Sequence, residues 1–240
     1  TVDPARLGHK ALAVNLSDLA ACGAKPLAFT LALALPGIDE PWLEGFSRGL
    51  FALADAHGCE LVGGDTTRGL LNICITVFGE VPAGAALLRS GARAGDDIWV
   101  SGTLGDARLA LEVFRGTLAL PADVFAQARM RMEQPIPRVA LGQALRGIAS
   151  AAVDVSDGLV GDLGHILASS RVGATLDADA ATSTVAAASA PGLGIEALRT
   201  CALSGGDDYE LVFAAAPSAR AAVEQAGKES FTRVTRIGRI

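Results

Sequence analysis

Two short apolar runs, each interrupted by Gly and Asp, most constrain the fold of this 240-residue sequence. The first reads LVGGDTTR at Leu61–Arg68, and the second reads AAVDVSDG at Ala151–Gly158. Strand-forming apolar residues open each run, and Asp and Gly then favour a turn. We therefore expect each group of carboxylates to emerge where a strand ends, which is a common position for functional sites.

The second run brings several oxygen atoms close together. Asp154 precedes Asp157 by three residues, with Ser156 between them. If the backbone turns there, both carboxylates and the hydroxyl can face one point, which suits a hard cation such as Mg²⁺. A purely local alternative is an Asx turn followed by an Asp N-cap for a helix that starts near Gly158.

The first run adds features that suit a phosphate. Gly63 and Gly64 allow the backbone to pass close to a ligand. Asp65, Thr66 and Thr67 supply three more oxygen-bearing side chains. A third Gly-Gly-Asp sequence occurs in LSGGDDYEL at 203–211. Repetition of this pattern indicates a site for a metal ion and a nucleotide.

Composition narrows the class of protein. Half of the residues are hydrophobic, which is enough for one large or two small domains with cores of their own. The formal net charge of -6 gives no electrostatic reason to expect nucleic acid or an anionic membrane as a partner. Local metal ions, rather than overall charge, would then have to meet phosphorylated ligands.

Cysteine and histidine spacing indicates neither a zinc site nor a disulfide framework. No CxxC motif occurs, and no uninterrupted apolar run is long enough to span a membrane. We expect a cytoplasmic protein whose cysteines are reduced core residues, with a disulfide as the minor alternative. The residues concerned are Cys22, Cys59, Cys74, Cys201, His9, His57 and His165.

Helical and strand patterns alternate along the chain. The expected helices cover residues 4–23, 40–57, 104–115, 122–132, 138–149, 158–170 and 218–227. The expected strands cover 28–35, about 61–65, 71–81, 97–101, 151–155, 173–176, 209–215 and 231–237. Residues 180–190 fit either a helix or a loose connection. Lys10, Asn15 and Asp18 lie on the polar face of the first helix, which could simply be a solvated face.

The sequence Pro82-Ala83-Gly84 marks a candidate domain boundary. Strands and helices alternate on both sides of it, with paired strands in each half. The fold class predicted is therefore α/β (α+β) in two domains. These are an N-terminal mixed-sheet domain over 1–82 and a C-terminal α/β domain over 83–240.

Five segments in register resemble the thiamine-monophosphate kinase family, which belongs to the superfamily of aminoimidazole ribonucleotide synthetase and selenophosphate synthetase. The resemblance extends from about Asp3 to Ile237. Its segments are KALAVNLSDLAACGAKP (10–26), LVGGDTTRG (61–69), LLRSGARAGD (87–96), VDVSDGLVGDLGHIL (153–167) and LSGGDDYEL (203–211).

The resemblance implies direct in-line transfer of the γ-phosphoryl group of ATP to thiamine monophosphate, assisted by several Mg²⁺ ions. It also implies a homodimer that pairs through the N-terminal domain. No P-loop sequence is present, in agreement with the family. No general base is expected, because the acceptor is a phosphate that is largely ionised at neutral pH. The implied metal ligands are Asp18, Asp65, Asp154 and Asp157, the implied ATP contacts are Gly64, Asp65, Arg89 and Ser156, and the implied substrate contact is Asp207.

Two departures from the family pattern affect these expectations. Asp207 stands where many members have Glu, so its side chain is one methylene shorter. Family members also have an N-terminal segment before Thr1 and a region beyond Ile237 that covers the thiamine ring. We therefore expect a polypeptide of these 240 residues alone to have little or no kinase activity.

Two alternatives remain open on the sequence. The chain could be another ATP-dependent member of the superfamily, of the aminoimidazole ribonucleotide synthetase or selenophosphate synthetase type. It could also be a nucleotide-binding relative without turnover. The segments LSDLAACGAKP and GGDTTRG fit the thiamine-phosphate branch better. The four carboxylates together argue against a site that has lost its chemistry.

Overall fold

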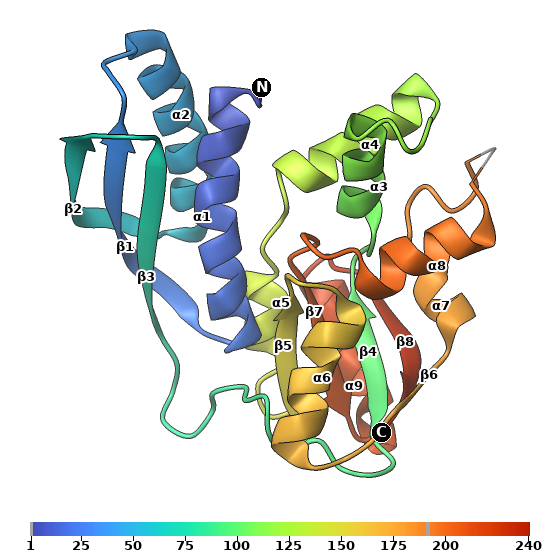
Figure 1. The fold of residues 1–240 in the computed structure, drawn as a ribbon. Coiled ribbons are helices and arrows are strands. Elements are labelled where there is room, and N and C mark those ends of the chain that lie inside the picture. Colours follow the sequence, from blue (N-terminus) through green and yellow to red (C-terminus); the bar gives the residue numbers. More distant parts are fainter. Residues whose placement is uncertain (1, 191–192) are drawn as a thin grey trace.

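Two β-sheets, each covered by helices, organise the chain (Figure 1). The computed structural model describes residues 2–190 and 193–240. The mixed α/β fold class predicted from the sequence is confirmed. In the described part of the chain, no helix is long and apolar enough to cross a membrane.

The first sheet is mixed and contains β1 (Lys25–Leu35), β2 (Glu60–Arg68) and β3 (Asn72–Glu80) in the order β2-β1-β3. β2 runs parallel to β1, whereas β3 runs antiparallel to it. Helices α1 (Pro4–Ala21) and α2 (Glu40–His57) cover one face of this sheet (Figure 1). β2 is therefore an edge strand.

Local sequence explains where the first two helices begin and end. The Asp3 carboxylate accepts hydrogen bonds from the Ala5 and Arg6 amides and caps α1, and Pro4 occupies its first turn. Asp39 caps α2 in the same way, and Gly58, in the left-handed conformation, ends it. These boundaries agree closely with the prediction.

The second sheet has the order β5-β7-β4-β8-β6, with antiparallel pairing throughout. Its strands are β4 (Asp97–Ser101), β5 (Ala151–Val155), β6 (Thr175–Leu176), β7 (Glu210–Ala215) and β8 (Val234–Arg239). The helices of this half are α3 (Asp106–Phe114), α4 (Ala122–Glu133), α5 (Val139–Ala144), α6 (Leu159–Ser170), α7 (Ala178–Thr182), α8 (Ile195–Ser204) and α9 (Arg220–Glu229).

One hydrophobic core is shared by both halves of the chain. Phe29 of β1 and Leu12 of α1 belong to the same buried cluster as Phe213 of β7 and Leu145 beside α5. A second cluster lies on the other face of the five-stranded sheet, where α6 packs. Helix α1 is thus packed between the two sheets (Figure 1). The domain boundary at 82/83 stays a prediction.

The expected turn at Gly63-Gly64-Asp65 is wrong. β2 continues through these residues, and every residue from Gly63 to Arg68 is paired with β1. Gly64 has φ +141°, and a Cβ there would lie 1.9 Å from the Leu31 carbonyl oxygen. Pairing with β1 therefore overrides the turn preference of the local sequence.

Several other expectations need correction. α5 ends at Ala144 rather than 149, and Gly147 beyond it has φ +74°. β6 has only two residues, and β8 starts at Val234 rather than 231. Helix α8 was not predicted, although its buried Leu198, Cys201 and Ala202 have helical spacing. All four cysteines are free thiols, but Cys22 and Cys74 are exposed rather than in the core.

The contact between α1 and α2 depends on glycine. A Cβ on Gly49 of α2 would lie 1.7 Å from the Ala5 carbonyl oxygen on α1. We predict that Gly49→Ala separates the two helices and lowers the free energy of unfolding by about 1–3 kcal/mol. As a control, a Cβ on Gly164 in α6 would have no neighbouring atom within 4 Å. Gly164→Ala should raise stability by about 0.5–1 kcal/mol, through helix propensity alone.

Chemical denaturation of both variants measures this difference. Equal effects of the two substitutions would contradict the close helix contact.

Candidate functional site

The candidate site lies where α1 meets the end of β5. Asp154, the penultimate residue of β5, is buried, and its Oδ2 accepts a hydrogen bond of 2.8 Å from the Ser17 hydroxyl of α1. Asp18 follows Ser17 on the same helix. The end of a buried strand and one face of a helix therefore bring two of the four predicted metal ligands together.

The Asp18 carboxylate acts electrostatically on Asp154. Asp18 is exposed to solvent, yet partial desolvation by the surrounding protein raises its pKa, and the nearby Arg89 guanidinium lowers it. Burial raises the pKa of Asp154, and the negative charge of Asp18 raises it further. Asp18, Asp154 and Arg89 thus form one electrostatic group, and their roles in metal and ATP binding stay predictions.

The loop after β5 is held by a residue that the sequence analysis did not identify. The amides of Ser156, Asp157 and Gly158 all donate to Oδ2 of Asp162, at 3.0, 3.0 and 3.1 Å. Asp157 remains exposed beside the site. An acidic residue in the first turn of the following helix was the available signal for this role.

A second loop, before β7, packs on the first. The Asp207 amide donates to the Ser156 carbonyl at 2.7 Å, and the Tyr209 amide donates to the Val155 carbonyl at 2.9 Å. Asp207 and Tyr209 both have positive φ, +65° and +52°. These backbone contacts place the predicted substrate residue Asp207 next to the loop that contains Ser156 and Asp157.

Lys10 adds a positive charge to this group. Its Nζ lies 2.5 Å from Oδ2 of Asp207 and 6.0 Å from the centroid of the Tyr209 ring. Burial raises the pKa of Tyr209, and the charge of Asp207 raises it further. The sequence places Lys10 on the polar face of the first helix, together with Asp18, but assigns it no function.

A buried ion-pair network anchors the end of the second loop at the start of β7. Glu210, the first residue of β7, binds Arg138 through both carboxylate oxygens, at 2.5 and 2.6 Å. Arg131 of α4 also donates to Glu210, at 2.6 Å. Because Glu210 lies three residues after Asp207, this network fixes the end of the loop on the sheet.

Asp65 is not part of this group within one chain. It is paired in parallel register with Ala32 of β1, and paired residues on neighbouring strands point to the same face. Phe29 belongs to the core under α1 and α2 and Leu31 packs against it, so Ala32 and Asp65 point to the opposite face. Gly64 lies on the same strand, β2, at the sheet edge far from β5 (Figure 1).

The carboxylates at this site suit a metal ion that takes only some of its ligands from the protein. Among residues 2–190 and 193–240, no group of three or more His, Cys, Asp or Glu side chains could hold a metal ion. Mg²⁺ in kinase sites is typically bound by one or two carboxylates, with substrate phosphates supplying further ligands. The carboxylates of Asp18 and Asp154, of which the first raises the pKa of the second, fit that arrangement.

Comparison with family models matches both halves of the chain. Residues 1–81 match the AIR synthase related protein N-terminal domain, and residues 93–240 match the corresponding C-terminal domain. The chain is 49% identical to thiamine-monophosphate kinase of Salmonella typhimurium over 240 residues, 100% of this chain and 73% of that protein. It is 47% identical to the Escherichia coli K12 enzyme over 235 residues, 94% of this chain and 69% of that protein.

Solved structures give the same result. The crystal structure of thiamine-monophosphate kinase from Stenotrophomonas maltophilia has a TM-score of 0.93 and 50% identity, over 98% of this chain and 76% of that one. The structure of AaThiL complexed with AMPPCP and TMP has a TM-score of 0.83 and 29% identity, over 100% and 75% of the two chains.

The electrostatic grouping can be tested at Cys22. Partial burial raises the pKa of this thiol, the Asp18 and Asp154 carboxylates raise it further, and Arg89 lowers it. Removing the Asp18 charge should lower the pKa of Cys22 and increase its thiolate fraction at pH 8. We predict that Asp18→Asn makes alkylation of Cys22 by iodoacetamide severalfold faster, measured by peptide mass spectrometry.

The exposed Cys74 on β3 provides an internal control, because its alkylation rate should not change. A Cys22 rate unaffected by Asp18→Asn would contradict the proximity of the two side chains.

Proposed function

The chain belongs to the thiamine-monophosphate kinase family, and we propose that it transfers the γ-phosphoryl group of ATP to the phosphate of thiamine monophosphate. The products are thiamine diphosphate and ADP. The observation that most supports this reaction is the convergence of Asp18, Asp154 and Arg89 with two interlocked loops. Such a site can hold two polyanions side by side through cations that the carboxylates recruit.

Phosphoryl transfer requires that the two substrates be positioned and that the charge on their phosphates be neutralised, rather than covalent catalysis. An oxygen of the acceptor phosphate attacks the γ-phosphorus of ATP in line. The bond from the γ-phosphorus to the β–γ bridging oxygen breaks, and its electron pair leaves with ADP. The second ionisation of a phosphate monoester lies near pH 6, so the nucleophile is already deprotonated at neutral pH. No side chain is therefore needed as a general base.

We assign the cation-binding role to Asp18, Asp65, Asp154 and Asp157. Mg²⁺ ions held there would neutralise charge on the phosphates of both substrates. Ser17 orients one of these ligands, because its hydroxyl donates to Asp154. Gly64, Asp65, Arg89 and Ser156 are proposed to contact ATP.

Asp207 is proposed to contact thiamine monophosphate, in concert with Lys10. In the free protein the two side chains form an ion pair, with Nζ and Oδ2 separated by 2.5 Å. The shorter arm of Asp, relative to Glu, is therefore already engaged with a neighbouring helix. Thiamine monophosphate would therefore contact the Lys10–Asp207 ion pair rather than a single charged carboxylate.

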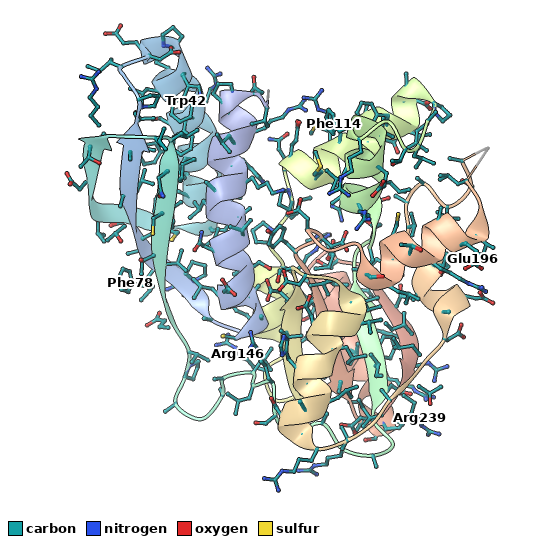
Figure 2. All side chains as sticks on the ribbon, in the orientation of Figure 1. Trp42, Phe78, Phe114, Arg146, Glu196 and Arg239 are labelled. Carbon is teal, nitrogen blue, oxygen red and sulfur yellow. The ribbon has the colours of Figure 1, made fainter. Side chains whose placement is uncertain are left out.

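A homodimer would account for the position of Asp65. The exposed edge strand β2 presents unpaired backbone groups, and apolar side chains lie on or beside this sheet. Exposed examples are Leu61, Val62, Leu71 and Phe78, the last labelled on β3 in Figure 2. We propose that two chains associate through this sheet, so that Asp65 of one chain serves the site of the other.

Four unpaired thiols also favour a cytoplasmic location for this protein.

The role of Asp154 in turnover has a direct test. Asp154→Asn keeps an oxygen that can accept from Ser17 but removes the charge that would bind the cation. We predict at least about a 100-fold loss of thiamine diphosphate formation by the full-length protein, with unfolding temperature largely retained. Asp179→Asn, on the exposed surface of α7, is the matched control and should leave the rate unchanged. Comparable rates for both variants would exclude a cation-binding role for Asp154.

Mixing two inactive variants tests the composite site. Asp65→Asn and Asp154→Asn should each be inactive as homodimers. In a mixed dimer, one of the two sites would receive both substitutions and the other would receive neither. After co-refolding with random pairing, about one quarter of the wild-type rate should return. No recovery in a mixture shown to contain mixed dimers would mean that Asp65 acts within its own chain.

A further inference from the structure

One carboxylate oxygen receives three consecutive backbone amides at the candidate site. Oδ2 of Asp162 accepts from Ser156 and Asp157 at 3.0 Å each and from Gly158 at 3.1 Å. Asp162 lies in the first turn of α6 and is 3% exposed. Its own amide donates to the Gly158 carbonyl at 3.0 Å, so loop and helix are joined in both directions.

The three amides belong to the residues that face the site. Ser156 and Asp157 are both proposed ligand contacts, and both side chains remain accessible. The N–H groups of residues 156–158 point toward Asp162. The Ser156 carbonyl therefore remains free, and it accepts a hydrogen bond of 2.7 Å from the Asp207 amide. Asp162 therefore fixes the first loop directly and the second loop through it.

A negative charge is a costly way to satisfy these amides. Burying a carboxylate requires strong compensation, and three charge-assisted hydrogen bonds to one oxygen provide it. The charge also lies near Asp154, which already shares the site with Asp18. Asp162 thus adds a third carboxylate beside that pair.

We propose that Asp162 is a positioning residue, which holds the backbone of residues 156–158 in the ligand-binding conformation before the nucleotide arrives. This inference rests on the proposed function of the same site. Asp162 itself touches neither substrate, since its side chain is buried under the loop and engaged by the three amides. Because Asp162 keeps the loop ordered in the free protein, the free energy of nucleotide binding is not reduced by the cost of ordering that loop.

Nucleotide binding by an isosteric variant tests this role. Asp162→Asn keeps the shape of the side chain but weakens the three hydrogen bonds, because the acceptor is no longer charged. We expect the dissociation constant of AMPPCP with MgCl₂, measured by titration calorimetry on the full-length protein, to rise at least about tenfold. The steady-state counterpart is a raised KM for ATP with a smaller change in kcat.

Asp177→Asn is the matched control. Asp177 also accepts two backbone amides at the start of a helix, from Asp179 at 3.1 Å and Ala180 at 2.9 Å, but on exposed α7. Both variants should lower the unfolding temperature, whereas only Asp162→Asn should weaken AMPPCP binding. An unchanged dissociation constant in folded Asp162→Asn would overturn the proposal.

Amide hydrogen exchange in the wild-type protein gives a second test that needs no variant. The amides of residues 156–158 should be protected in the free protein, and AMPPCP should add little protection. Rapid exchange that slows only after AMPPCP binding would show that the loop is not pre-formed. Both tests are independent of turnover. A wild-type protein that binds AMPPCP but does not phosphorylate thiamine monophosphate would refute the proposed function and leave this inference standing.

Discussion

The approach of helix α1 to the end of strand β5 is the contact on which the rest of the site depends. It buries the Ser17 hydroxyl against the Asp154 carboxylate and brings the charge of Asp18 close to it. This contact is possible because one hydrophobic core continues from the three-stranded sheet, through α1, to the five-stranded sheet. Two carboxylates held at such proximity favour a cation between them, and this requirement connects the fold with phosphoryl transfer.

Around this contact, the protein stabilises irregular backbone rather than adding more ligands. Asp162 binds three amides of the loop after β5, and the loop before β7 donates two of its own amides to the β5 segment. Buried Glu210, paired with Arg131 and Arg138, fixes the far end of that second loop. These interactions explain how residues with positive φ, such as Asp207 and Tyr209, are maintained at the site.

Much of this could be predicted from the sequence, for identifiable physical reasons. Caps and glycines determine the ends of α1 and α2. The alternation of Ile73, Ile75 and Val77 with Cys74, Thr76 and Phe78 is typical of a strand and predicts β3. The local pattern DVSD indicated a carboxylate cluster, and two of its members lie at the site. The strand through Gly64 was missed because pairing with β1 is a long-range interaction. Asp162 was not identified because its partners are backbone amides, which no side-chain pattern reveals. Lys10 was not identified because its partner, Asp207, lies 197 positions away in the sequence.

The decisive measurement is to incubate full-length protein with ATP, MgCl₂ and thiamine monophosphate, and to quantify ADP and thiamine diphosphate in the same samples. A transfer between two phosphates predicts that the products accumulate in equal amounts, and that neither forms when thiamine monophosphate is omitted. Formation of ADP without thiamine diphosphate, or of neither product, would contradict it.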